Sequence, residues 1–443
     1  MLCQYSKHFC LRSIQIHVKY EQEYLSIGGL IMREVFADRD FRKLFVGNLF
    51  SGFGQGMTMI GISWYLVSTT GTATLLGSTM LMSGILSFLV GPYIGTQIDR
   101  FSRKLILQVE NMTGFTVMAM LALWGFFGVY AEWMLIAIFM VTTLMYQLHY
   151  PAQSALVQER FSPRQYNQIN SLLEIEGQTA AVLAGGAAGI MLEHYGLHIV
   201  LLVDALTYLF SFLMLSRMKY TFTLADQAKA NAHLSWLGQF GQSWDYIRSK
   251  KGFLLFGISV LFPFIALMAG NLLAPVFVEG SLNEGVMIYS FSEVSYAVGA
   301  VAAGFLVNGI MRRYGETASM LANILLFAAA YLLIVLLPNG WMFVALYTLV
   351  GWCNASTRLI RQSIYMTMVP KEMMGRVISF LNSVGMLMRL LLIGTFTVML
   401  NWTGAGTGYL LLAGLLLLAA LGAMLSMRHL LPAARTEVAA GEG

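Results

Sequence analysis

The sequence predicts an all-α integral membrane protein with twelve transmembrane helices in two pseudo-symmetric six-helix bundles. Three observations lead to this fold class. Hydrophobic residues make up 57% of the 443 residues and charged residues only 11%, whereas charged residues account for about a quarter of an ordinary soluble protein. The chain contains twelve long apolar stretches, and a segment of its first half recurs in its second half.

The apolar stretches follow one another with short connections, except at the midpoint of the chain. An α-helix needs about 20 apolar residues to cross a ~30 Å hydrocarbon layer, and each stretch is long enough. The predicted spans are residues 43–68, 74–97, 104–128, 133–157, 166–192, 197–216, 253–278, 286–309, 317–337, 341–366, 376–399 and 406–427.

The recurring segment lies at the end of the second span and again at the end of the eighth. A second pair of matching segments surrounds Pro163 and Pro370. Two such matches at similar spacing indicate a duplicated unit. The matching residues of the first pair are Gly95, Asp99, Arg103 and Lys104 and, in the second half, Gly304, Asn308, Arg312 and Arg313.

Lysine and arginine are confined to one side of the predicted membrane. If the spans alternate in direction, the six connections on the other side contain neither residue. Because positively charged loops stay in the cytoplasm, we expect a multi-pass protein of a bacterial inner (cytoplasmic) membrane with both termini cytoplasmic. This placement explains the net charge of +5, which therefore does not predict a nucleic-acid partner.

The domain organisation follows from the spans. Residues 33–217 and 253–428 are the two predicted bundles, residues 218–252 a cytoplasmic linker with an amphipathic helix, and residues 429–443 a cytoplasmic tail. Residues 1–32 lack the features of a signal peptide, and the stretch that starts at Met32 resembles a natural beginning. We expect this N-terminal extension either to be absent from the native protein or to form a disordered arm.

Several function classes are excluded by what the sequence lacks. The three cysteines show neither a disulfide framework nor a metal-ligand spacing. The sequence contains no phosphate-binding loop of an ATP-driven pump and no catalytic triad. We therefore expect no enzymatic activity, no metal and no cofactor.

The first and fourth spans carry polar side chains that lipid cannot satisfy. Asn48 and Gln55 belong to one polar stripe of the first span, and Tyr146 and His149 precede a proline in the fourth. A polar stripe in a membrane must face protein or water. These residues therefore either line a substrate cavity or form hydrogen bonds between helices, and His149 either packs as a satisfied histidine or carries a proton.

Acidic residues inside the spans are candidates for function, since an ionisable group at bilayer depth costs about 2.5–3.5 kcal/mol. The fifth span contains Glu174 and Glu176, which point about 200° apart on a helix and cannot share one face. The sixth span contains Asp204 and the eighth Glu293. Glu110 lies near the cytoplasmic start of the third span, where we expect an interfacial carboxylate rather than a working group.

The second half carries polar and basic residues in three of its spans. Asn271 lies between two prolines of the seventh span, and Asn354, Arg358 and Arg361 lie in the tenth. Arg361 is close enough to the helix end to reach the membrane surface. Arg389 in the eleventh span is too deep for that, so it should have a carboxylate or water beside it.

Together these features resemble the major facilitator superfamily over residues 33–428. The connection between the second and third spans matches a signature of that family, with Ser102 in place of a usual glycine. The segments VDALTYLFS and SEVSYAVGAVAAG are similar to the branch of drug and proton antiporters that includes macrolide efflux proteins, although Gly186 stands where that branch often has proline. The residues at the glycine, acidic and basic positions of the signature are Gly95, Asp99, Arg100, Arg103 and Lys104.

The resemblance implies two bundles that rock about a central cavity to give alternating access. It implies an inner gate at which Asp99 meets Arg376 near the start of the eleventh span. It also implies a monomer in contact with membrane lipids that exports an amphipathic organic compound in exchange for protons. The alternatives are a lipid or lysolipid flippase of the same fold and an exporter of a siderophore-like metabolite.

The resemblance and the polar residues together give the candidate site. The candidate proton carriers are Glu176, Glu174 and Glu293, and their candidate charge partners are Arg358, Arg361 and Arg389. The candidate residues of the substrate cavity are Asn48, Gln55, Tyr146, His149, Asn271 and Asn354.

Overall fold

The computed structural model describes residues 33–70, 73–162, 165–220, 252–369 and 371–441, together with residues 244, 247, 248 and 250. Within these ranges the regular structure is helical and no strand is found. The long helices are α2 (Arg39–Thr70), α3 (Ala73–Arg100), α4 (Arg103–Phe127), α5 (Glu132–Arg160), α6 (Tyr166–Tyr195), α7 (Leu197–Ser216), α10 (Phe253–Gly280), α11 (Val286–Tyr314), α12 (Glu316–Leu336), α13 (Gly340–Met368), α14 (Lys371–Thr403) and α15 (Ala405–Gly441).

Ten of the described helices are long and apolar enough to cross a membrane. The other two long helices are α2 and α13, and both carry polar residues along their length. Asn48 and Gln55 interrupt the apolar character of α2, as Arg358 and Arg361 interrupt that of α13. The prediction of an all-helical, multi-pass membrane protein is confirmed, and the count of twelve spans stays a prediction.

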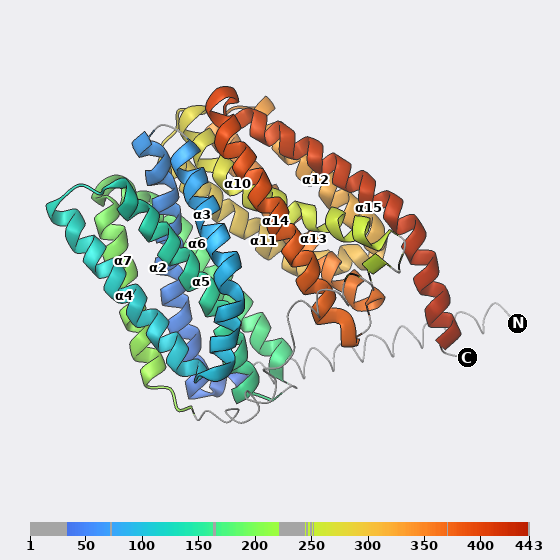
Figure 1. The fold of residues 1–443 in the computed structure, drawn as a ribbon, viewed down its shortest axis with the longest axis horizontal. Helices are drawn as coiled ribbons and strands as arrows, with labels where there is room; N and C mark the ends of the chain where they lie inside the picture. The colour runs from blue at the N-terminus through green and yellow to red at the C-terminus, as the bar shows by residue number, and fades with distance from the viewer. Residues whose placement is uncertain are drawn as a thin grey trace, which may run out of the picture.

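The helices form two groups in which the same pairs of helices are in contact. In the first group α2 packs against α6 and α7, α4 against α5 and α7, and α3 against α5. In the second group α10 packs against α14 and α15, α12 against α13 and α15, and α11 against α13. Figure 1 shows the first group in blue to green beside the second in yellow to red. This repeated pairing agrees with the duplication predicted from the sequence.

The most extensive contacts between the groups are those of α6 with α11 and of α3 with α14, and α10 also contacts α2 and α3. In the first pair the Gly189 amide donates to Ser290 Oγ at 2.9 Å, and the Ser290 hydroxyl donates to the Gly185 carbonyl. In the second pair a Cβ at Gly77 would collide with the Thr397 side chain. These contacts lie toward the end where α2 and α6 finish, and the two groups separate toward the other end (Figure 1).

We call that other end, where α2 begins and α7 ends, the basic end. Its described residues include Arg103, Lys104, Arg160 and Arg217. The end at which the two groups meet through Ser290 is called the opposite end. The connections of the opposite end contain no lysine or arginine in the sequence.

Three predicted segments lie partly or wholly outside the described residues. The N-terminal extension of residues 1–32 is wholly outside them, as is most of the predicted linker helix. Of that linker, Ile247 is buried, and the Trp244 ring lies 5.9 Å from the Phe380 ring. Helix α15 continues to Gly441, so most of the predicted tail is helical. The predicted domain boundaries stay predictions.

Glycines allow α11 and α13 to touch through their backbones. A Cβ at Gly299 would collide with the Thr348 carbonyl, and one at Gly351 would collide with the Tyr296 carbonyl. Small residues at a membrane helix contact permit this approach, and close packing is then the main source of association. The α11–α13 contact therefore depends on the absence of side chains at these two positions.

Gly299→Ala is expected to lower the thermal unfolding temperature of the detergent-solubilised protein. The added methyl group must push two backbones apart, and such overpacking costs about 1–3 kcal/mol. Gly304→Ala on the same helix is the matched control, because no atom lies within 4 Å of its Cβ position. Equal unfolding temperatures for the two variants would contradict the close α11–α13 contact.

Candidate functional site

Glu176 is a buried carboxylate on the face of α6 that packs against α2. Its exposed fraction is 6%. A Cβ at Gly52 would lie 3.3 Å from Ala180, and one at Gly56 would lie 2.7 Å from Ala184. The faces of α2 and α6 that carry these residues are therefore in contact. One turn earlier along each helix, the same faces carry Asn48 on α2 and Glu176 on α6.

The side chains around Glu176 are polar. Asn48 is 2% exposed, and its side-chain amide lies beside the Glu176 carboxylate. Gln153 of α5 also lies beside Glu176, and the charges of Glu176 and His149 interact. The structure thus surrounds this carboxylate with amides and one imidazole inside the first helix group.

Glu110 is paired with His149 between α4 and α5. The His149 Nδ1 atom lies 3.1 Å from both carboxylate oxygens of Glu110. The Glu110 side chain is 2% exposed and that of His149 is 20% exposed. The expectation of an interfacial carboxylate at position 110 was therefore wrong, because α4 turns this residue toward α5 rather than toward the membrane surface.

Asp204 is a further buried carboxylate, at the contact between α2 and α7. The Thr58 hydroxyl donates to its Oδ2 atom at 2.6 Å, and the residue is fully buried. A Cβ at Gly54 would collide with Asp204, so α2 and α7 approach closely there. Asp204 and Thr58 thus form a polar contact inside the first group. Gln55 forms another, because its amide donates to the Thr142 carbonyl at 3.1 Å.

Glu174 and Arg358 form an ion pair that joins the two helix groups. The Arg358 Nη2 atom lies 3.1 Å from Glu174 Oε1, with α6 on one side and α13 on the other. Their side chains are 53% and 48% exposed, so the space around this pair is not filled by protein. Tyr146 of α5 is 66% exposed and interacts with the charges of both residues.

The remaining candidate residues lie apart from Glu176. Asn354 donates to the Tyr296 hydroxyl at 2.8 Å, and Arg361 donates to the Val260 carbonyl at 3.4 Å. Arg389 lies against Gly84 of α3, and its Nε atom has no partner among the described residues. Glu293 is partly exposed on α11, and Asn271 is exposed on α10. The structure therefore does not bring Arg361 or Arg389 to an acidic candidate.

The basic residues of the signature segment hold α4 to its neighbours at the basic end. Arg103 lies 3.6 Å from Glu159 at the end of α5, and Glu159 also accepts a hydrogen bond from the Tyr220 hydroxyl. Lys104 donates to the carbonyls of Ser216 and Met218 at 3.2 and 2.7 Å. Four residues of the signature and gate lie outside the described side chains: Gly95, Asp99, Arg100 and Arg376. The predicted contact between Asp99 and Arg376 therefore stays a prediction.

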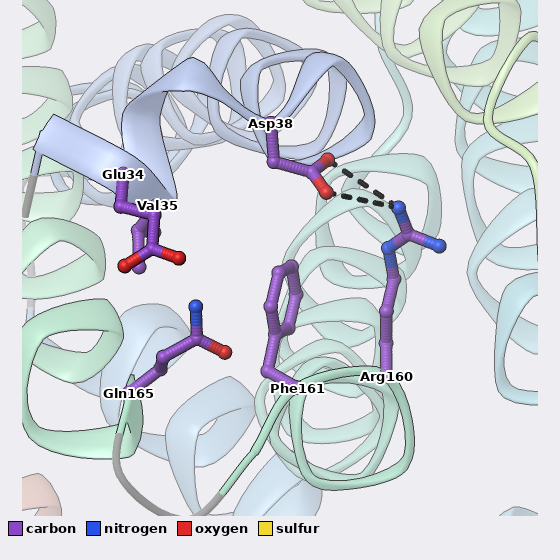
Figure 2. Close-up of a pocket in the computed structure, with 6 residues that line it drawn as sticks. All are labelled: Glu34, Val35, Asp38, Arg160, Phe161 and Gln165. Carbon is purple, nitrogen blue, oxygen red and sulfur yellow. Dashed lines mark hydrogen bonds and ion pairs between the residues drawn. The ribbon is translucent and has the colours of Figure 1, made fainter. Parts of the chain in front are cut away.

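A pocket of about 430 Å³ lies at the basic end, between the start of α2 and the end of α5 (Figure 2). The Arg160 side chain forms part of its wall. The Arg160 Nη2 atom lies 3.2 Å from Asp38 Oδ2 and 2.9 Å from Asp40 Oδ2. None of the predicted cavity residues lines it. The lining residues are Glu34, Val35, Asp38, Arg160, Phe161 and Gln165.

Asp40 is the acidic centre of this region. Burial alone would raise the pKa of its carboxyl group, but hydrogen bonds from Lys43 and from the Lys219 amide, together with the charge of Arg160, hold the pKa below its usual value of 3.8. The ionised carboxylate therefore stabilises the fold by fastening α2 to α5 and to the segment after α7.

Asp40→Asn is expected to lower the free energy of unfolding at pH 7 by about 1–3 kcal/mol, since it removes hydrogen bonds to a charged group. Because the folded-state pKa lies below 3.8, this stabilisation is complete above about pH 4 and is lost as the pH falls through the folded-state pKa. Unfolding curves in detergent at several pH values measure the difference. The control is Asp38→Asn, which keeps an acceptor for the helix N-terminus and should have a smaller effect; equal losses that persist at low pH would contradict this role.

Comparisons with known proteins agree on one family. A family model described as Major Facilitator Superfamily matches residues 44–392. Macrolide efflux protein A of Streptococcus pyogenes is 20% identical over 348 residues, which cover 78% of this chain and 85% of that protein. Macrolide efflux protein A of Enterococcus faecalis is 21% identical over 318 residues, which cover 70% of this chain and 97% of that protein.

Solved structures show the same fold. The nucleoside transporter NupG superposes with a TM-score of 0.66 at 16% identity, covering 88% of this chain and 99% of that one. A bacterial homologue of the iron transporter ferroportin in its inward-facing state superposes with a TM-score of 0.62 at 14% identity, covering 86% of this chain and 98% of that one. At these identities the likeness concerns the fold alone.

Proposed function

Since the chain belongs to the major facilitator superfamily, and is thus a transporter rather than an enzyme, we propose that it exports amphipathic organic compounds in exchange for protons. The proposed site of action is a bacterial inner membrane, with the basic end and both termini in the cytoplasm. Its proposed partners are the transported compound, protons and membrane lipids, and it works as a monomer.

The observation that carries this proposal is the burial of Glu176 inside a membrane helix. A carboxylate at such depth is costly unless it serves a function and has a polar partner. Glu176 is buried beside Asn48 and Gln153 and interacts with the charge of His149. A carboxyl group in this setting can bind a proton and release it when the helices move, which is the chemistry that proton coupling needs.

The contacts between the helix groups support alternating access. The groups meet at the opposite end through Ser290 and Thr397, and they separate at the basic end (Figure 1). With the basic end in the cytoplasm, this arrangement is an inward-facing state. In the outward-facing state α6 and α11 would part at Ser290, and the basic ends would close.

The proposed substrate class rests on the side chains between the groups and on the relatives. Tyr146 and the Glu174–Arg358 pair offer an aromatic ring and both signs of charge in a space that protein does not fill. The relatives named macrolide efflux proteins are about a fifth identical to this chain. A large amphipathic compound fits both observations.

Glu176→Gln is expected to abolish proton exchange, because an amide cannot bind and release the proton. The measurement uses liposomes that hold the purified protein and a pH-sensitive dye, to which macrolides, cationic dyes, siderophores and lysolipids are added in turn. Glu193→Gln is the matched control, because Glu193 is an exposed glutamate of the same helix outside the proposed site, and it should keep the substrate-dependent pH change.

Undiminished pH-driven exchange by Glu176→Gln would reject this carboxyl group as the proton carrier. Faster movement of lysolipid between leaflets, with no pH change for any compound, would favour the flippase instead. A pH change with siderophores alone would restrict the substrate to that class.

Gly189→Val is expected to stop transport by preventing closure at the opposite end. A Cβ at Gly189 would already lie 2.7 Å from the Ser290 Cβ, so a larger side chain keeps α6 and α11 apart. Gly186→Val is the control, since nothing lies within 4 Å of its Cβ position. The measurement places Ser290→Cys in a cysteine-free background and follows its reaction with a membrane-impermeant thiol reagent. The cysteine should react faster in the Gly189→Val variant than in the Gly186→Val variant. Equal reaction rates would contradict closure of α6 against α11 at this point.

A further inference from the structure

The contact between Glu110 and His149 has no part in the exchange described so far. It lies inside the first helix group, away from the Glu174–Arg358 pair that joins the groups. The equal distances of 3.1 Å from His149 Nδ1 to both carboxylate oxygens place one N–H between two acceptors. A carboxylate this deeply buried needs a positive or hydrogen-bonding partner, and His149 supplies it.

Among the described residues of the helices packed on α4, no cation other than His149 faces Glu110. These helices are α5 and α7. From α7 the Tyr208 ring covers Gly114, one turn along α4 from Glu110, and Asp204 lies one turn from Tyr208. Neither group carries a positive charge. Arg103, two turns earlier on α4, lies beside Glu159.

His149 also faces Glu176. Gln153 lies one turn after His149 on α5 and borders Glu176, and the charges of His149 and Glu176 interact. From α2 the group facing Glu176 is the neutral Asn48, while α11 meets α6 nearer the opposite end, at Ser290 and Val294. Glu174, which is paired with Arg358 of α13, lies on the other face of α6. The His149 imidazole therefore contacts the buried carboxyl group of Glu110 on α4 and interacts with the charge of a second one, Glu176 on α6.

The number of charges decides how such a cluster behaves. With His149 protonated, Glu110 ionised and Glu176 protonated, the cluster is neutral, which a low-dielectric interior favours. When Glu176 releases its proton, the cluster carries one negative charge, and the imidazolium then attracts two carboxylates. The positive charge of His149 therefore lowers the cost of releasing the proton, and Glu110 keeps that charge in place.

We propose that His149 and Glu110 are positioning residues that set the pH at which Glu176 exchanges its proton. They act through charge and do not contact the transported compound. This inference rests on the proposed proton coupling. It assigns the two residues effects in the same direction, because His149 supplies the positive charge and Glu110 keeps that charge in place.

The test compares His149→Gln, Glu110→Gln and the double variant in lipid nanodiscs. Infrared difference spectra over a range of pH values follow the protonated carboxyl band that is lost in Glu176→Gln. A nearby charge moves such a titration by about 1–3 pH units. We expect His149→Gln to move the midpoint up by about one unit or more. Glu110→Gln should move it up as well, because the buried imidazole loses the carboxylate that keeps it charged, and the double variant should stay above the wild-type value.

Midpoints that do not move, or that fall in either single variant, would overturn the proposal. Unfolding temperatures show whether each variant is folded. If Glu110→Gln does not accumulate, His149→Lys replaces it, because a fixed positive charge must keep the midpoint at or below the wild-type value, whereas His149→Gln must raise it.

The infrared titration does not require transport, so the two proposals can fail separately. Transport that stays proton-coupled in Glu176→Gln would reject the proposed proton carrier. Transport that loses coupling in Glu176→Gln, together with unchanged midpoints in the variants of His149 and Glu110, would reject this inference alone. The pH dependence of exchange in liposomes should follow the same order as the infrared midpoints.

Discussion

The organisation of this transporter depends on one constraint, the cost of an ionisable group inside a membrane. Such a group must be neutral, paired or in contact with water. The first helix group meets this constraint by enclosing Glu110, Glu176 and Asp204 among hydroxyl, amide and imidazole side chains. The Glu174–Arg358 pair meets it differently, because both side chains are about half exposed between the two groups.

Two neighbouring glutamates of α6 thereby reach different surroundings. Glu176 lies on the face that packs against α2, whereas Glu174 lies on the face turned toward α13. The same helix thus connects a buried group that can hold a proton to an exposed ion pair at the proposed substrate site. A movement of α6 relative to α11 would change the surroundings of both, which gives proton and substrate a physical means of affecting each other.

Much of the fold could be predicted from the sequence, and less of the site. Apolar stretches and the repeated segments predict the helices and the two similar groups, since both depend on local composition. The helical period also predicts that Glu174 and Glu176 face different ways. The burial of Glu110 could not be predicted, because its distance from a helix end gives depth but not the neighbour it faces. Nor could the sequence select Arg358 among three arginines, since that choice depends on how α6 and α13 approach each other across the groups.

The most direct test of proton coupling is whether binding of substrate releases a proton from the protein. Purified wild-type protein in weakly buffered detergent at neutral pH is mixed with a macrolide, and the pH of the medium is followed with an indicator dye. Saturating macrolide is expected to release protons from the wild type and none from Glu176→Gln. Binding of the macrolide with no proton release from the wild type would contradict proton coupling.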